Sequence, residues 1–308
     1  MIQYLIILLD ETSASFCHYD NPKKERCLIP LEVLRQGIRF GMMENLMIQY
    51  VYPDYELPEE YKDVIESIDH SKIKPLADDA DVLVLDAPQE INADKPVVLR
   101  IKKQDLFALT DAVAKMLKSV PRLNVVLTDV ETFTDEDFET YKKVLAGFST
   151  EVKKLYVEGK SPQLNLLTDR MMLSQMNNCG AGDTTITLAS NGKFYVCPAF
   201  YYEDEADSIG DLEHGLDIKN KQLYKLGYAP ICRHCDAWQC KRCIWLNRKT
   251  TLEVNTPSHE QCVLAHLERN ASRELLQNIR KHGSFLPEQE EIKEIDYLDP
   301  FDKRDTWQ

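Results

Sequence analysis

Short apolar runs alternate with stretches of helical periodicity through the first half of the chain. Apolar side chains that follow one another without helical spacing predict strands at residues 2–9, 46–52, 81–85, 96–101 and 124–127. Amphipathic spacing and helix-start signals predict helices at residues 30–45, 58–68, 104–120 and 135–148. Strands that alternate with helices indicate parallel βα units. Because fewer units fit than the eight of a closed barrel, the pattern favours an incomplete (β/α) barrel or an open doubly wound sheet.

The pattern changes near residue 170. Two β-rich runs, at 183–189 and 193–196, flank Ser190-Asn-Gly192, which predicts a hairpin because Asn-Gly suits a tight turn. We expect this hairpin to bring Cys197 back toward Cys179. A helix is predicted at residues 256–281, and the acidic segment from 289 to 308 lacks helical periodicity.

The cysteines are the strongest chemical signal in the chain. Seven of the nine lie in the last 130 residues, at Cys179, Cys197, Cys232, Cys235, Cys240, Cys243 and Cys262. Seven thiols exceed the four ligands of one tetrahedral zinc ion. Short spacings with a remote partner suit one or two [4Fe-4S] clusters. Zinc held by Cys232, Cys235, Cys240 and Cys243 is the alternative, with His234 and His259 as further ligand candidates.

Composition and charge indicate which kinds of partner and which cellular compartment suit this chain. The chain has 308 residues, a 44% hydrophobic fraction and a formal net charge of -14. This charge argues against nucleic acid or an anionic membrane as a partner, since both require concentrated Lys and Arg. The apolar start lacks the features of a signal peptide, and no run of 18 apolar residues exists. With an odd number of cysteines, we expect a cytoplasmic protein that uses its thiols for metal.

The cysteine layout over residues 175–270 resembles the SPASM domain, the C-terminal cluster-binding extension of many peptide-modifying radical SAM enzymes. Here Gly192 precedes Cys197 by five residues, and Ile209-Gly-Asp-Leu212 is similar to a small motif between the second and third cysteines of that family. The resemblance implies an outer cluster and an inner cluster. The outer one would use Cys232, Cys235, Cys240 and Cys262. The inner one would use Cys179, Cys197 and Cys243, with one iron open or filled by another donor.

The two sequence signatures of SAM binding are absent. Radical SAM enzymes carry Cys-x3-Cys-x2-Cys after the first strand, whereas this chain has Ser13-Ala-Ser-Phe-Cys17-His-Tyr19-Asp20. Serine is a poor iron ligand near neutral pH, and aspartate is a hard oxygen donor. The Gly-Gly-Glu-Pro motif is replaced by Val51-Tyr-Pro-Asp-Tyr-Glu-Leu-Pro58, in which side chains block close approach of a ligand to the backbone. We therefore do not expect reductive cleavage of SAM.

The whole chain resembles the CXXX repeat peptide maturase family, through its arrangement and through Cys17-His-Tyr-Asp and Cys240-Lys-Arg-Cys-Ile-Trp. The resemblance implies a partial, degenerate radical SAM-like (β/α) barrel at 1–165, a SPASM-like iron–sulfur domain at 166–285 and an acidic tail at 286–308. It implies maturation of a ribosomally synthesised, Cys-rich precursor peptide. One alternative is a non-catalytic protein that binds the peptide or relays electrons for another modifying enzyme. Its partner would then be a maturation enzyme or an electron donor. The second alternative is a zinc-stapled adaptor.

Candidate substrate-binding residues follow the first two strands. Tyr52, Asp54 and Tyr55 come directly after the second strand, and Cys17 follows the first. Parallel βα folds place their sites at the carboxyl ends of strands. These side chains therefore predict a peptide-binding lip, although ordinary aromatic packing and a merely buried Cys17 are alternatives.

Overall fold

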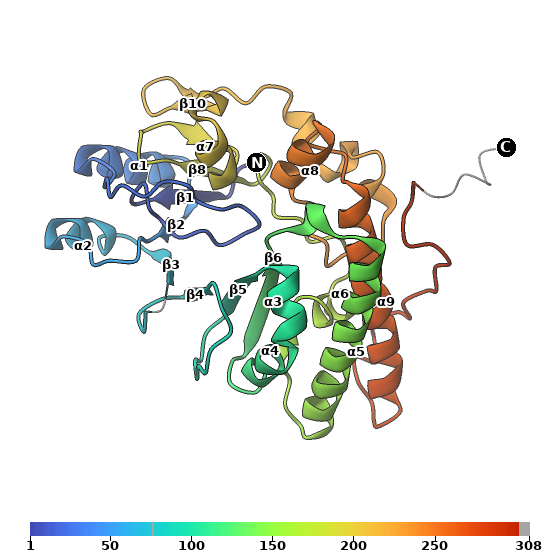
Figure 1. The fold of residues 1–308 in the computed structure, drawn as a ribbon. Coiled ribbons are helices and arrows are strands. Elements are labelled where there is room, and N and C mark those ends of the chain that lie inside the picture. The colour runs from blue at the N-terminus through green and yellow to red at the C-terminus, as the bar shows by residue number, and fades with distance from the viewer. Residues whose placement is uncertain (76, 302–308) are drawn as a thin grey trace. The chain divides into compact units, whose positions relative to one another are not determined.

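The computed structural model describes residues 1–75 and 77–301, and the chain forms two compact units that each combine two segments. The first unit comprises Met1–Val84 and Cys179–Ala229, and the second comprises Leu85–Asn178 and the chain from Pro230 onward (Figure 1). The functional domain boundaries expected near residues 165 and 285 remain a prediction.

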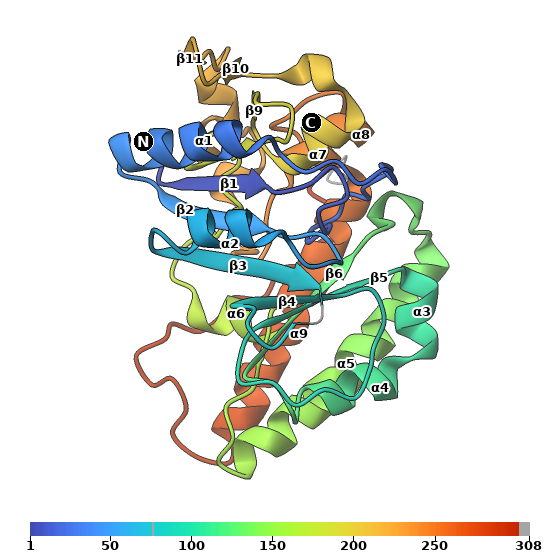
Figure 2. The same cartoon turned by 90° about the vertical axis from the view of Figure 1, so that its left-hand side faces the viewer.

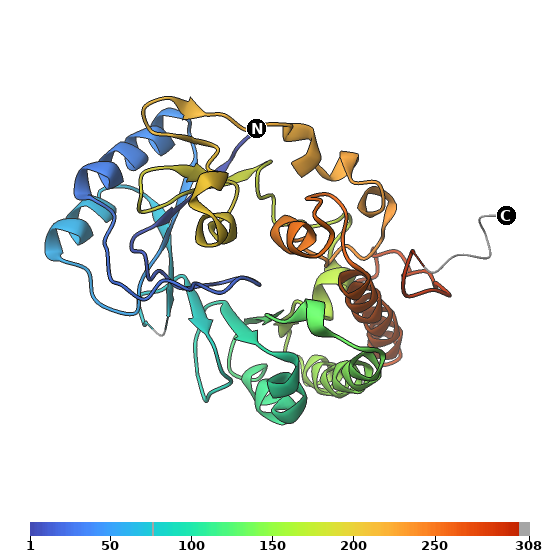
Figure 3. The same cartoon turned by 45° about the horizontal axis from the view of Figure 1, so that its top comes forward.

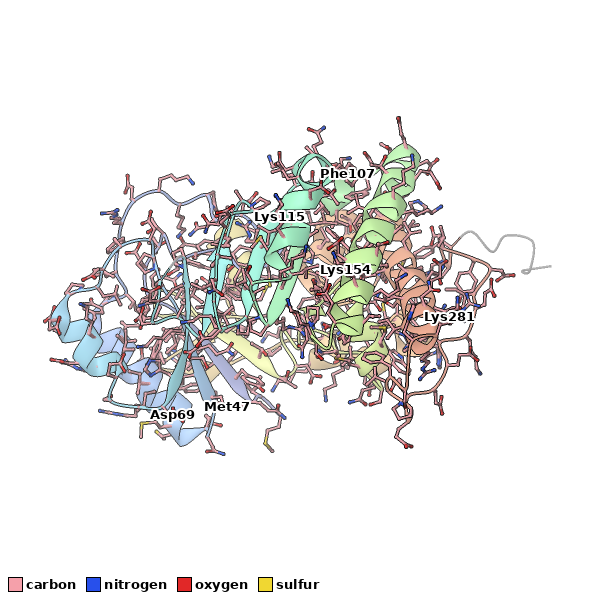
Figure 4. The ribbon with its side chains drawn as sticks, turned by 90° about the horizontal axis from the view of Figure 1, so that it is seen from below. Met47, Asp69, Phe107, Lys115, Lys154 and Lys281 are labelled. Atoms are coloured by element: carbon pink, nitrogen blue, oxygen red, sulfur yellow. The ribbon has the colours of Figure 1, made fainter. Side chains whose placement is uncertain are left out.

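A largely parallel sheet forms the centre of the first unit. Its strands are β1 (Tyr4–Leu8), β2 (Met47–Val51), β3 (His70–Pro75), β4 (Val82–Leu85), β8 (Thr185–Leu188) and β9 (Phe194–Tyr195). They lie in the order β4-β3-β2-β1-β8-β9, and β9 alone among these pairs antiparallel. The predicted hairpin is therefore confirmed, with Thr187 opposite Tyr195. Met47 and Asp69 lie at the edge where β2 and β3 begin (Figure 4), and the candidate site residues follow the opposite ends.

Two helices cover one face of this sheet (Figure 2). They are α1 (Leu31–Met43) and α2 (Glu59–Ile65). Two glycines let α1 approach the strands closely. A Cβ on Gly37 would lie 2.3 Å from Leu188 Cδ2, and one on Gly41 would lie 2.8 Å from Ile48 Cδ1. The remaining elements of this unit are α7 (Pro198–Glu203), the short pair β10 (Gly210–Asp211) and β11 (Gly215–Leu216), and single 3-10 turns at Glu205–Asp207, Lys221–Tyr224 and Leu226–Tyr228.

The second unit combines parallel strands with long helices. Strands β5 (Val97–Ile101), β6 (Arg122–Leu127) and β7 (Gln163–Leu164) lie in the order β7-β6-β5. The helices are α3 (Lys103–Ala108), α4 (Thr110–Met116), α5 (Asp135–Val157), α6 (Thr168–Met172), α8 (Ile244–Thr251) and α9 (His259–Arg280), with 3-10 turns at Val130–Thr132 and Cys232–His234. The long helices α5 and α9 lie side by side (Figure 3).

Capping explains where the two long helices begin. The hydroxyl of Thr134 accepts from the Asp137 backbone N–H, and the Asp137 side chain accepts from the Thr134 backbone N–H. Ser258 and Gln261 form the same reciprocal capping box at the start of α9. The start of α9 fixes the position of Cys262, which lies one turn into the helix.

Several predicted elements differ from the structure in detail. The helix expected at residues 104–120 is divided between α3 and α4, because Leu109 leaves the helical region with φ -111°. Strand β3 was missed because its sequence is mostly polar and only Ile73 within it is buried. Within the described residues, no helix is both long enough and apolar enough to span a membrane.

Gly37→Ala should lower the free energy of unfolding by about 1–3 kcal/mol, because the added methyl group overpacks α1 against Leu188. Gly147→Ala is the matched control, because nothing lies within 4 Å of its Cβ position. That substitution should be neutral or stabilising. Urea titration of both variants checks the difference, and equal stabilities would contradict this account of the contact between α1 and the sheet.

Candidate functional site

Four cysteines of the second unit line one cavity of about 370 Å³. Cys232 begins a 3-10 turn, Cys235 follows that turn, Cys240 lies on the next loop, and Cys262 projects from α9. These are the residues that the SPASM resemblance assigns to the outer cluster. The structure therefore brings this predicted set together from two separate segments of the chain.

Burial and mutual repulsion disfavour the charged form of these thiols. Burial raises the pKa of Cys232 to about 11 and that of Cys240 to about 12, and neighbouring thiolate charges add to both effects. Burial followed by the charges of Cys240 and Cys232 also raises the pKa of Cys262. Four thiolates can be held together here only if positive charge compensates them, and a metal centre supplies such charge.

Backbone groups point at two of the sulfurs. The Ala237 N–H donates to Cys235 Sγ at 3.4 Å, and the Arg242 N–H donates to Cys240 Sγ at the same distance. Arg242 has a φ of 45°, in the left-handed region, which is uncommon for a residue with a side chain. Hydrogen bonds to sulfur are one of the means by which proteins set the potential of iron–sulfur clusters.

An ion-pair network of two buried arginines and the partly exposed Asp236 lies beside this cavity and was not predicted. Arg269 is fully buried and donates to both carboxylate oxygens of Asp236, at 2.9 and 2.7 Å. Arg170 donates to the same carboxylate at 3.3 Å and lies 3.9 Å above the ring of Trp238. Burial alone would raise the pKa of Asp236, but the hydrogen bonds and positive charges of Arg269 and Arg170 together lower it. The network ties the loop that bears Cys235 to α9.

The three histidines near the cysteines occupy different positions. His234 lines the cavity, whereas His259 pairs with Asp299. His266 was not predicted, yet its Nε2 lies 3.4 Å from Cys235 Sγ. The signal was present in the sequence, since Cys262 and His266 are four residues apart on one helix and therefore share a face.

The predicted inner set divides between the two units. Cys179 and Cys197 belong to the first unit, where Cys197 is the N-cap residue of α7. Burial raises the pKa of Cys197, and the charges of Cys179 and then Cys17 contribute, which agrees with a hairpin that returns Cys197 toward Cys179. Cys243 belongs to the second unit, at the N-cap of α8. A shared cluster of Cys179, Cys197 and Cys243 therefore stays a prediction.

The four cysteines at the cavity can be compared with the ligand requirements of a cluster and of a single ion. Over residues 1–75 and 77–301, no three His, Cys, Asp or Glu side chains converge as ligands of one metal ion. The outer thiols instead surround a cavity. A cubane offers a separate iron atom to each thiolate, so its ligands need not meet at one point. Four thiols that line one cavity, two of them buried and two half-buried, are a donor set that fits a [4Fe-4S] cluster.

The loop that would hold a SAM cluster has other contacts. Ser13 is fully buried, and its hydroxyl donates to the Val51 carbonyl oxygen at 2.9 Å and accepts from the Asp10 N–H at 3.0 Å. Asp20 is exposed and Cys17 is half-buried. The residue at the first thiolate position of the radical SAM motif therefore supports the backbone in this chain.

A second cavity, of about 610 Å³, lies at the ends of β2 and β3. Three of the predicted substrate-binding residues line it, namely Tyr52, Asp54 and Tyr55, whereas Cys17 is not part of its described lining. Lys74 Nζ lies 4.3 Å from the centre of the Tyr52 ring. The Tyr55 hydroxyl donates to Asp10 Oδ2 at 2.6 Å, and Asp10 is fully buried.

Glu268 is a half-buried acid on α9, two residues beyond His266. Its carboxyl accepts from the Tyr141 hydroxyl at 2.9 Å and from Gln239 Nε2 at 3.4 Å. Burial raises the pKa of Glu268 to about 7, against the opposing effect of these hydrogen bonds. The group therefore changes charge near neutral pH.

Comparison with known proteins gives a fold-level match. No protein-family model matches the sequence, and no curated protein matches it. The solved structure of native anSMEcpe with bound AdoMet and a Cp18Cys peptide is 14% identical, with a TM-score of 0.64 over 90% of this chain and 99% of that chain. Native anSMEcpe with bound AdoMet alone is 13% identical, with a TM-score of 0.62 over 90% and 99%. SuiB of Streptococcus suis bound to S-adenosylmethionine is 12% identical, with a TM-score of 0.43 over 85% and 77%.

The two anSMEcpe structures identify the fold. The enzyme anSME is a radical SAM/SPASM anaerobic sulfatase-maturating enzyme. The present chain shares the α/β fold of anSMEcpe, with parallel strands compatible with an incomplete barrel. The predicted fold class is thus confirmed, and the predicted resemblance to radical SAM/SPASM proteins holds at the level of the fold.

Glu268→Gln should remove a pH dependence of stability. Because the folded pKa of about 7 exceeds the ordinary value of 4.5, the wild-type protein should lose stability as pH rises from 4.5 through 7. The loss should be on the order of 3 kcal/mol relative to the variant. Urea denaturation of both proteins at pH 5 and pH 8 measures the difference, and parallel profiles would show that Glu268 does not titrate in this way.

Proposed function

We propose that this chain is a SPASM-type iron–sulfur protein that acts in the maturation of a ribosomally synthesised peptide without cleaving SAM at the usual motif. The observation that carries the proposal is the cavity lined by Cys232, Cys235, Cys240 and Cys262. The fold of anSMEcpe supports it, since that protein was solved with AdoMet and a peptide.

The four cysteines would hold a [4Fe-4S] cluster, whose chemistry is the transfer of single electrons. The chain's own residues provide its surroundings. Backbone N–H groups of Ala237 and Arg242 donate to two sulfurs, and the Arg269–Asp236 pair holds the loop in place. Cys179, Cys197 and Cys243 are the proposed ligands of a second cluster.

The second cavity is the proposed peptide site. Among its described lining residues, carboxylates outnumber amines by six to three, so the lining favours a cationic ligand. The carboxylates are Asp54, Glu56, Glu59, Asp63, Glu66 and Asp79. Tyr52 and Tyr55 add aromatic surface beside these charges. A precursor peptide with Lys or Arg side chains, and with cysteines as reacting groups, suits this cavity.

A second candidate function is non-catalytic. Ser13 is buried and bonded to the backbone, and Asp20 replaces another thiolate, so the usual source of a radical is missing. On that observation the chain would bind peptide or relay electrons for another maturation enzyme, in the cytoplasm. A zinc-stapled adaptor is a third candidate and would contain no sulfide.

Cys232→Ser should lower the iron content of anaerobically reconstituted protein by about four atoms per chain, because a buried ligand of a cubane is removed. Cys27→Ser is the control, since Cys27 is exposed and outside the predicted ligand sets. Iron and acid-labile sulfide are measured together. Zinc without sulfide in the wild-type protein would establish the adaptor instead.

Incubation with the precursor peptide separates the catalytic and non-catalytic functions. A change in peptide mass without another protein supports the catalytic role, and tight binding without a mass change supports the relay role. Asp54→Asn together with Glu56→Gln should weaken binding of a basic peptide several-fold, because both carboxylates line the acidic cavity. If the Kd of the peptide does not depend on salt and the double substitution leaves it unchanged, the peptide does not bind in this cavity.

A further inference from the structure

His266 has the position of a ligand at the four-cysteine cavity. It follows Cys262 by one helical turn on α9, and its ring is 4% exposed. Its Nε2 lies 3.4 Å from Cys235 Sγ, and the residue lines the same cavity as Cys232 and Cys240. The predicted ligand sets do not include it.

The other ring nitrogen shows which atom of His266 carries the proton. Nδ1 contacts the carbonyl oxygen of Leu298, and a carbonyl oxygen can only accept a hydrogen bond. Nδ1 therefore bears the hydrogen, and in the neutral ring Nε2 presents its lone pair toward Cys235. Histidines that bind metals commonly have this arrangement, with one nitrogen donating to a backbone carbonyl and the other facing the metal.

The segment after α9 holds this orientation. Leu298 lies between Tyr297 and Asp299 in the chain. The Tyr297 ring packs edge-on against the His266 ring, with 5.6 Å between the ring centres. Asp299 pairs with His259 and is 3% exposed. Both contacts fix the Leu298 carbonyl relative to α9. The ring is therefore oriented by contacts on two sides.

Five donor side chains thus surround this cavity, whereas a cubane cluster needs only four protein ligands. Because His266 Nε2 and Cys235 Sγ are 3.4 Å apart, both reach toward one position. We propose, resting on the iron–sulfur function above, that Cys235 and His266 are alternative ligands of one iron in this cluster. The site can then be held by four thiolates or by three thiolates and one imidazole.

The choice of ligand has a chemical consequence. Replacing thiolate by neutral imidazole removes one negative charge from the cluster surroundings. His ligands in place of Cys raise the reduction potential in iron–sulfur centres of the Rieske type. An exchange between Cys235 and His266 would therefore change the potential at which this cluster accepts an electron.

Cys235→Ala provides the direct test in the full-length protein, reconstituted anaerobically with iron and sulfide. It should keep the wild-type iron content, gain nitrogen hyperfine coupling in pulsed paramagnetic resonance of the reduced cluster, and shift the reduction potential upward. Cys232→Ala should lose about four irons, because no imidazole replaces that thiolate. Loss of the cluster from Cys235→Ala, or its retention without nitrogen coupling, would overturn the proposal.

Double variants identify the nitrogen. Cys235→Ala with His266→Ala should lose the cluster, whereas Cys235→Ala with His282→Ala should keep it, since His282 is exposed. A coupling that His234→Ala abolishes and His266→Ala leaves would assign the ligand to His234 and overturn the proposal. Near-ultraviolet circular dichroism checks that each variant is folded. A wild-type protein without iron and sulfide defeats the proposed function as well, whereas failure of Cys235→Ala alone defeats only the exchange.

Discussion

The second unit depends on one constraint, which is the free-energy cost of holding four thiolates close together in one cavity. Burial raises the pKa of Cys232, Cys240 and Cys262, and each thiolate charge raises it further for the others. Hydrophobic packing does not offset such repulsion, but bound metal does. The loop from Cys232 to Cys243 contains little regular structure, and the Asp236–Arg269 pair and the start of α9 position it.

In the first unit, side chains join the loops that follow β1 and β2. The Ser13 hydroxyl bridges Asp10 and Val51. Asp10 in turn accepts from Tyr55, so the loops after β1 and β2 are joined by side chains. The wide cavity at the ends of β2 and β3 remains, with an acidic lining. This acidic cavity is the place where we propose that the peptide binds, apart from the cysteine-rich region proposed to hold iron.

Much of the fold was predictable because apolar residues mark its strands and helices directly. β1, β2 and the hairpin of β8 and β9 follow from runs such as Leu5–Leu9 and from Asn191-Gly192. Strand β3 was not predictable from the sequence, because its burial depends on neighbouring strands rather than on its own polar sequence. The outer cysteine set follows from the resemblance to the SPASM domain; these four residues line one cavity, and their role as ligands stays a prediction. Arg269 and His266 were missed because charged and titratable helix residues are usually exposed, and only tertiary contacts show that these are buried.

The central claim is that iron occupies the cavity lined by Cys232, Cys235, Cys240 and Cys262. Anomalous diffraction at the iron and zinc absorption edges, from crystals grown without oxygen, tests it most directly. The account predicts a strong iron signal inside this cavity and no zinc signal there. A zinc signal at these sulfurs, or disulfides joining them, would contradict it.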